Sequence, residues 1–142
     1  MGSRCVLILD DDPLVTRALS RGLRARGIDV HTSNRSIGFL SMVRRYRPSL
    51  VVVDVAMPGL DGGQVAHLIR AEPDLQHTQL ILYAGESDDE LARRAASCEA
   101  DGWLPKGADV EGTLDTFARW AKRSERPVPR SHRRLAVVKK AS

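Results

Sequence analysis

Three short apolar runs in the sequence each end on a charged residue, and this repeated pattern limits the folds that the chain can adopt. The runs are residues 6–9 before Asp10, residues 51–53 before Asp54, and residues 102–105 before Lys106. In an open parallel α/β sheet, ligands bind beyond the carboxyl ends of the strands, where residues distant in sequence come together. The pattern therefore predicts one site that combines these acids with this lysine.

Strand-like runs alternate with segments of helical period along most of the chain. The predicted strands are residues 6–9, 28–32, 50–53, 80–83 and 102–104. The predicted helices are residues 13–26, 36–46, 64–71, 88–97 and 109–123. Strict alternation of strands and helices predicts an α/β fold with a doubly wound parallel sheet.

Length and composition favour one domain outside the membrane. The chain has 142 residues, 42% hydrophobic and 28% charged, which suffices for a single buried core. No apolar stretch approaches the roughly 20 residues of a membrane-spanning helix, and the N-terminus lacks the apolar core of a signal peptide. We therefore expect a cytoplasmic protein without membrane insertion, in which Cys5 and Cys98 stay reduced.

Charge is distributed unevenly between the body of the chain and its end. Residues 1–118 carry 13 Lys and Arg against 17 Asp and Glu, whereas residues 119–142 carry 9 against 1. With two prolines and little periodicity, residues 125–142 are predicted to be a basic, disordered tail or linker that follows a domain at residues 1–124. Such a tail could contact nucleic acid phosphates only nonspecifically, and we do not expect nucleic acid to be the main partner.

The charged residues at the strand ends suit metal-assisted phosphoryl chemistry. Adjacent carboxylates at residues 10–12 repel one another unless a cation offsets them, and Mg²⁺ prefers carboxylate, water and phosphate oxygens. Asp54 could complete the ligand set, or it could attack phosphorus as a nucleophile. Lys106 is the only lysine before residue 119, and an ammonium group suits a phosphoryl oxygen as a compact charge.

The motifs VLILDDDP, VVVDVAMPGLDGG and DGWLPK, in this order, resemble those of the response-regulator receiver domain of two-component signalling. The resemblance runs from about Arg4 to Arg123. It implies the fold of the chemotaxis regulators: a flavodoxin-like, five-stranded parallel sheet of order 2-1-3-4-5 with five helices.

The resemblance also implies a role for individual residues. It makes Asp54 the phosphoacceptor and Lys106 the residue that contacts the phosphoryl group. Asp10, Asp11, Asp54 and the backbone carbonyl of Ala56 become the ligands of a Mg²⁺ cofactor.

Two departures from the family pattern concern the conformational change that follows phosphorylation rather than the phosphoryl transfer itself. Ala84 stands where the family has a Thr or Ser whose hydroxyl contacts the phosphoryl group, and an alignment moved by one residue offers Tyr83 instead. Ser87, the nearest hydroxyl, is interpreted as a helix N-cap. Gly107 replaces the proline that usually follows the lysine, so we expect a looser loop. Trp103 is at the position of the family's activation-reporting aromatic residue, or it simply covers the core.

These observations leave several functions open. The leading hypothesis is a receiver that accepts a phosphoryl group from a histidine kinase or phosphotransfer protein and is not otherwise an enzyme. Its output would be protein contact through residues 88–97, 102–104 and 109–123. The alternative is a degenerate receiver that binds partners independently of phosphorylation. A minor alternative is an aspartate-based phosphohydrolase, suggested by Asp10 and Asp12 as a D-x-D pair. The sequence names neither the kinase nor the output partner.

Overall fold

The protein is described by a computed structural model, which covers residues 3–57, 62–107 and 109–123. The strands are β1 (Ser3–Leu9), β2 (Asp29–Ser33), β3 (Pro48–Val53), β4 (Gln79–Ala84) and β5 (Gly102–Pro105). They form one sheet of order β2-β1-β3-β4-β5, in which each neighbouring pair is parallel. The order implied by the family resemblance is thereby confirmed.

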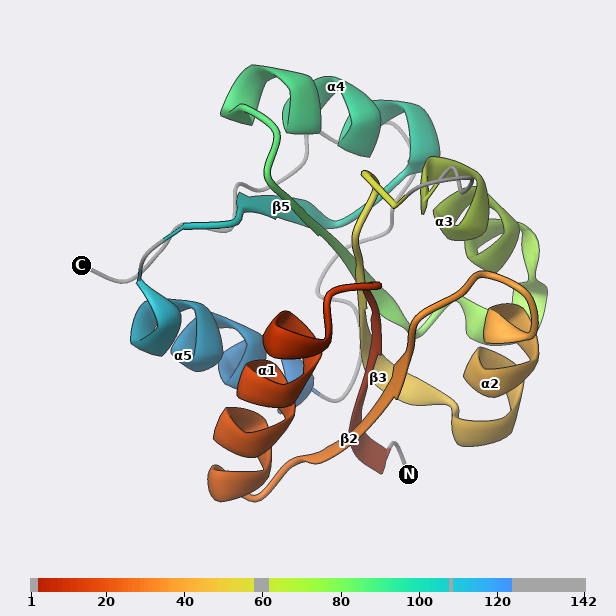
Figure 1. Ribbon diagram of the computed structural model, residues 1–142. Helices are drawn as coiled ribbons and strands as arrows, with labels where there is room; N and C mark the ends of the chain where they lie inside the picture. The colour runs from red at the N-terminus through yellow and green to blue at the C-terminus, as the bar shows by residue number, and fades with distance from the viewer. Residues whose placement is uncertain (1–2, 58–61, 108, 124–142) are drawn as a thin grey trace.

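Helices cover both faces of the sheet (Figure 1). They are α1 (Pro13–Ala25), α2 (Phe39–Tyr46), α3 (Gly62–Ala71), α4 (Asp88–Cys98) and α5 (Val110–Ala121), with a short 3-10 helix, η1, at Pro73–Leu75. Helices α1 and α5 pack on one face, and α2, α3 and α4 pack on the other. The fold is therefore doubly wound. None of the described helices is long and apolar enough to cross a membrane.

The core has two layers because successive strand residues point to opposite faces. In β1, Val6 and Ile8 belong to the layer beneath α1 and α5, whereas Leu7 and Leu9 belong to the layer beneath the other helices. Strands β3 and β4 are buried at every position. Burial on both faces explains why these strands have continuous apolar sequences rather than alternating ones.

Local capping residues set most helix boundaries. The side chain of Asp12 accepts a hydrogen bond from the Leu14 N–H and caps α1. Ser87 caps α4, as predicted, by accepting a hydrogen bond from the Glu90 N–H at 3.2 Å. The prediction that the second helix begins at residue 36 was wrong. Gly38 occupies the N-cap of α2 at φ 85°, a left-handed conformation that suits glycine, so the helix begins at Phe39.

The C-terminal end of α5 is fixed to the amino edge of the sheet. Ser49 Oγ donates to the Ala121 carbonyl at 2.7 Å, and Gln79 Nε2 donates to the Trp120 carbonyl at 2.7 Å. Both donors are buried near the beginnings of β3 and β4. They satisfy carbonyl groups that the last turn of a helix otherwise leaves without partners.

Candidate functional site

The carboxylates of Asp10, Asp11 and Asp54 converge at the carboxyl edge of the sheet. Asp10 directly follows β1 and Asp54 directly follows β3, which lies beside β1. The Asp10 N–H donates to the Ser33 carbonyl at 3.1 Å, and the Asp54 N–H donates to the Leu9 carbonyl at 2.9 Å. The sheet ladder thus extends into both acids. One carboxylate oxygen from each of the three aspartates lies within 4.8 Å of the others.

Backbone hydrogen bonds orient the two buried carboxylates. Asp10 is 1% exposed and Asp54 is 6% exposed. Asp10 Oδ1 accepts the Asp12 N–H at 2.9 Å, and Asp54 Oδ1 accepts the Ala56 N–H at 2.9 Å. In both residues the second oxygen, Oδ2, accepts none of these backbone hydrogen bonds and is available to other groups in the site.

Lys106 contacts both of these second oxygens. Its Nζ lies 2.7 Å from Asp10 Oδ2 and 3.2 Å from Asp54 Oδ2. Its backbone N–H donates to the Ala84 carbonyl at 2.7 Å, which fixes the start of the side chain beside β4. Burial opposes the charge on Lys106, but the charges of Asp10 and Asp54 outweigh burial and raise the pKa of the lysine above its ordinary value. The ammonium group is therefore charged at neutral pH.

The site has more negative charge than the protein neutralises. Three carboxylates face one ammonium group, and burial raises the pKa of Asp10, although Lys106 and the Asp12 N–H partly oppose that shift. Asp10 Oδ2 is buried, and its partner is the ammonium group of Lys106 at 2.7 Å. A hard divalent cation such as Mg²⁺ takes carboxylate oxygens as ligands. The donor set and the excess of carboxylates over ammonium groups fit such an ion.

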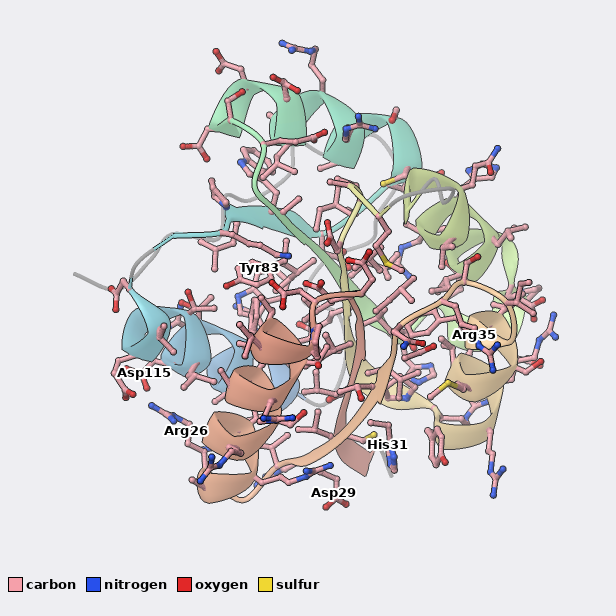
Figure 2. All side chains as sticks on the ribbon, viewed as in Figure 1. Arg26, Asp29, His31, Arg35, Tyr83 and Asp115 are labelled. Atoms are coloured by element: carbon pink, nitrogen blue, oxygen red, sulfur yellow. The ribbon has the colours of Figure 1, made fainter. Side chains whose placement is uncertain are left out.

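A cleft of about 550 Å³ opens beside the carboxylates. Its lining comes from the turn after β1, the first residues of α1, the end of β2 and the segment that follows β2. The lining residues are Asp10, Asp11, Pro13, Thr16, Thr32, Ser33, Asn34 and Arg35. Figure 2 shows Arg35 on the segment between β2 and α2. The sequence analysis missed residues 32–35 as part of the site. The strand order implied by the family resemblance could have predicted them, because β2 lies next to β1 and therefore ends beside the acids that follow β1.

The switch positions of the family pattern are both buried. Ala84 is the last residue of β4, is 0% exposed and offers no hydroxyl group. Trp103 is 8% exposed and packs in the core layer beneath α4, and its indole Nε1–H donates to Asp88 Oδ1 at 3.2 Å. This packing is compatible with both interpretations of Trp103. The side chain of Ala56 is exposed.

The strand order and the acids at the ends of β1 and β3 define a flavodoxin-like domain with its site at the carboxyl edge of the sheet. The sequence model of the response regulator receiver domain matches residues 6–117. The chain belongs to this family, the receiver domains of two-component signalling. Such domains ordinarily receive a phosphoryl group from a histidine kinase and bind Mg²⁺ through acidic residues.

Known relatives and structures agree with this assignment. The response regulator MprA of Mycobacterium leprae is 33% identical over 122 residues, which are 84% of this chain and 52% of that protein. MprA of Mycobacterium avium is 30% identical over the same shares of both chains. The chain thus spans about half the length of the curated relatives that it matches.

Solved structures match over nearly the whole described chain. The chemotaxis response regulator CheY4 of Vibrio cholerae has a TM-score of 0.75 at 24% identity, covering 84% of this chain and 99% of that one. The beryllofluoride-activated receiver domain of DrrB, a protein of Thermotoga maritima, has a TM-score of 0.71 at 25% identity. That match covers 87% of this chain and 100% of the DrrB domain. The CheY4 likeness supports the fold alone.

Proposed function

We propose that Asp54 accepts a phosphoryl group from a histidine kinase or phosphotransfer protein, and that the domain passes the signal on by protein contact. The observation that carries this proposal is the convergence of Asp54, Asp10, Asp11 and Lys106 at one edge of the sheet. The exchange would take place in the cytoplasm. The domain would catalyse at most its own phosphorylation and dephosphorylation.

The phosphoryl transfer needs one nucleophile and a means of neutralising charge. A carboxylate oxygen of Asp54 forms a bond to phosphorus as the phosphorus–nitrogen bond of a phosphohistidine breaks, and the donor imidazole takes up a proton. Lys106, which already lies 3.2 Å from Asp54 Oδ2, pairs with an oxygen of the transferred group.

Asp10, Asp11, Asp54 and the Ala56 carbonyl are the residues proposed to hold Mg²⁺. When bound, the ion supplies positive charge to the phosphoryl oxygens. The convergence of three carboxylates on a single ammonium group supports this assignment. Asp12 has a different task, because its side chain caps α1. The D-x-D arrangement of a phosphohydrolase therefore gains no support from the geometry.

The output surface is proposed to be the face formed by α4, β5 and α5. A second candidate function is a degenerate receiver that binds its partner without a phosphorylation-dependent change. Ala84 favours this second function because it cannot supply the hydroxyl that links the phosphoryl group to the following loop. The hydrogen bond from Trp103 to Asp88 favours it too, because it ties β5 to α4 in one arrangement.

Amide NMR spectra with Mg²⁺ and beryllofluoride, a mimic of the phosphoryl group, test both functions. We expect shifts in the wild type and none in Asp54→Asn, whose side chain has the same shape but lacks the charge. Shifts that reach Trp103 and α4 support a working switch. Shifts confined to the surroundings of Asp54 favour the degenerate receiver, and identical spectra with and without the mimic contradict phosphoacceptance.

A further inference from the structure

Tyr83 is a buried aromatic residue beside the site that the family pattern does not assign. It lies in β4 immediately before Ala84, is 7% exposed, and belongs to the core layer beneath α1 and α5. Figure 2 shows its side chain in the region between the sheet and these two helices. Ala84 belongs to the opposite core layer. Tyr83 is therefore not a substitute for the missing hydroxyl residue.

Helix α5 fixes the orientation of the Tyr83 ring. The ring meets Phe117 edge-on, with centroids 5.3 Å apart and planes at 83°. Burial raises the pKa of Tyr83, and the neighbouring Thr113 side chain partly opposes that rise. Both neighbours are buried residues of α5. An edge-to-face pair in a buried position leaves the ring little freedom to turn.

Lys106 lies over the face of this fixed ring. Its Nζ is 5.6 Å from the centroid of Tyr83, within the range at which an ammonium group is attracted by an aromatic face. The backbone N–H of Lys106 donates to Ala84, the next residue of β4. Two adjacent residues of β4 thus contact Lys106: Tyr83 contacts its ammonium group, and Ala84 contacts its backbone N–H.

We propose that Tyr83 is a positioning residue for Lys106, which holds the ammonium group between Asp10 and Asp54 and connects it to α5. This inference rests on the proposed function, in which Lys106 contacts the phosphoryl group. Lysine has a long and flexible side chain, and ordering such a side chain during binding costs affinity. The ring reduces that cost by orienting the lysine before the ligand arrives.

The test measures the affinity of the full chain for beryllofluoride at saturating Mg²⁺, by NMR titration. Tyr83→Leu removes the ring face, and we expect it to weaken binding about threefold to tenfold, as for one side chain that loses its preorganisation. Tyr83→Phe retains the face and should stay within about twofold of the wild type. Ile28→Val is the matched control, because Ile28 belongs to the same core layer but lies directly before β2, at the opposite edge of the sheet from Lys106, and this variant should also stay within about twofold.

A spectroscopic signature complements the affinities. In the wild type and in Tyr83→Phe, ring currents should shift the side-chain methylene protons of Lys106 upfield, and this shift should vanish in Tyr83→Leu. Where Tyr83→Leu does not fold, Tyr83→Met supplies a ring-free side chain with more freedom to fill the space.

Two results would overturn the inference: unchanged affinity in the folded ring-free variant, or an equal loss of affinity in Ile28→Val. Failure of the proposed function looks different, because beryllofluoride would then bind neither the wild type nor any variant. In that case the upfield shift decides the inference, and its absence from the wild type would refute the positioning of Lys106 by Tyr83.

Discussion

Asp10 is a carboxylate whose charge the fold opposes. Burial raises its pKa, and the charge of Asp54 adds to that shift, while Lys106 and the Asp12 N–H lower it in part. The folded protein therefore binds this proton more tightly than the unfolded chain does. It follows that the stability contributed by Asp10 is greatest below the unfolded pKa and is lost as pH rises through the folded pKa.

Asp10→Asn should for this reason stabilise the Mg²⁺-free protein at neutral pH. We expect a gain of about 1 kcal/mol in the free energy of unfolding, the order of the desolvation cost of one buried polar group. The gain should shrink as the pH falls, because wild-type Asp10 then becomes protonated. Urea unfolding in EDTA across a pH series measures both effects. Asp12→Asn, at an exposed cap that asparagine also fills, is the control, and a gain that grows toward acid pH would contradict this account.

At the scale of elements, helices α1 and α5 approach closely at Gly22. A methyl group at this position would lie 2.3 Å from a terminal carbon of Leu114, closer than the two atoms can approach. Charges also join the same helices, because Arg26 pairs with Asp115 at 3.1 Å (Figure 2). The glycine is therefore required by packing, despite its low helix propensity.

Gly22→Ala is expected to lower the free energy of unfolding by about 1–3 kcal/mol, the usual cost of overpacking. In a Leu114→Ala background, where the obstructing side chain is absent, the same change should instead recover part of the roughly 1 kcal/mol by which alanine favours a helix. Chemical denaturation of the four proteins of this cycle measures the coupling. Equal effects in both backgrounds would show that the helices do not meet at Gly22.

The cap of α4 controls an element that lies beside the site. Ser87→Ala removes the acceptor for the Glu90 N–H, and we expect a loss of about 1 kcal/mol. Amide hydrogen exchange should quicken in the first turn of α4, next to the Asp88 contact of Trp103. Ser87→Thr keeps a hydroxyl and should retain most of the protection. An unchanged exchange rate in Ser87→Ala would mean that the acids of this turn suffice.

Most elements could be predicted from the sequence because their signals are local. Strands β3 and β4 are apolar at nearly every position, and Asp12 and Ser87 have the side chains that cap helices. The start of α2 was misplaced because periodicity continues before Gly38, whose left-handed backbone ends it. The order of the strands came from the family resemblance, since helical period does not say which strands are neighbours.

The site was predicted only where its residues follow strands. Asp10, Asp54 and Lys106 occupy such positions, and the structure brings them together. Thr32 and Arg35 line the cleft through the adjacency of β1 and β2, which no local pattern encodes. The contact of Tyr83 with Lys106 likewise depends on the register of β4 against β5. Residues 124–142 lie outside the described residues, so the basic tail remains a prediction.

At the scale of the whole molecule, metal binding and folding should be linked. The unfolded chain does not hold the three carboxylates together, so Mg²⁺ should bind the native state and raise its stability. An excess of ligand of about 100 times the dissociation constant corresponds to about 2.7 kcal/mol. Thermal unfolding with increasing Mg²⁺ should show a rising midpoint that EDTA reverses. The rise should be much smaller in Asp54→Asn and unaffected in Asp12→Asn, and an equal rise in all three proteins would refute a metal site at Asp54.

Helix α5 is held differently at its two ends. Ser49 and Gln79 bind its last carbonyl groups at the amino edge of the sheet. Tyr83, beside Lys106, packs against the helix at Phe117, ahead of these carbonyl groups, and has Thr113 as a neighbour closer to the start of the helix. If a movement of Tyr83 displaces α5 while Ser49 and Gln79 still bind its last carbonyl groups, the helix tilts about its C-terminal end. Rearrangement at the phosphoacceptor edge would therefore tilt α5 while its last residue, Ala121, stays bound to Ser49.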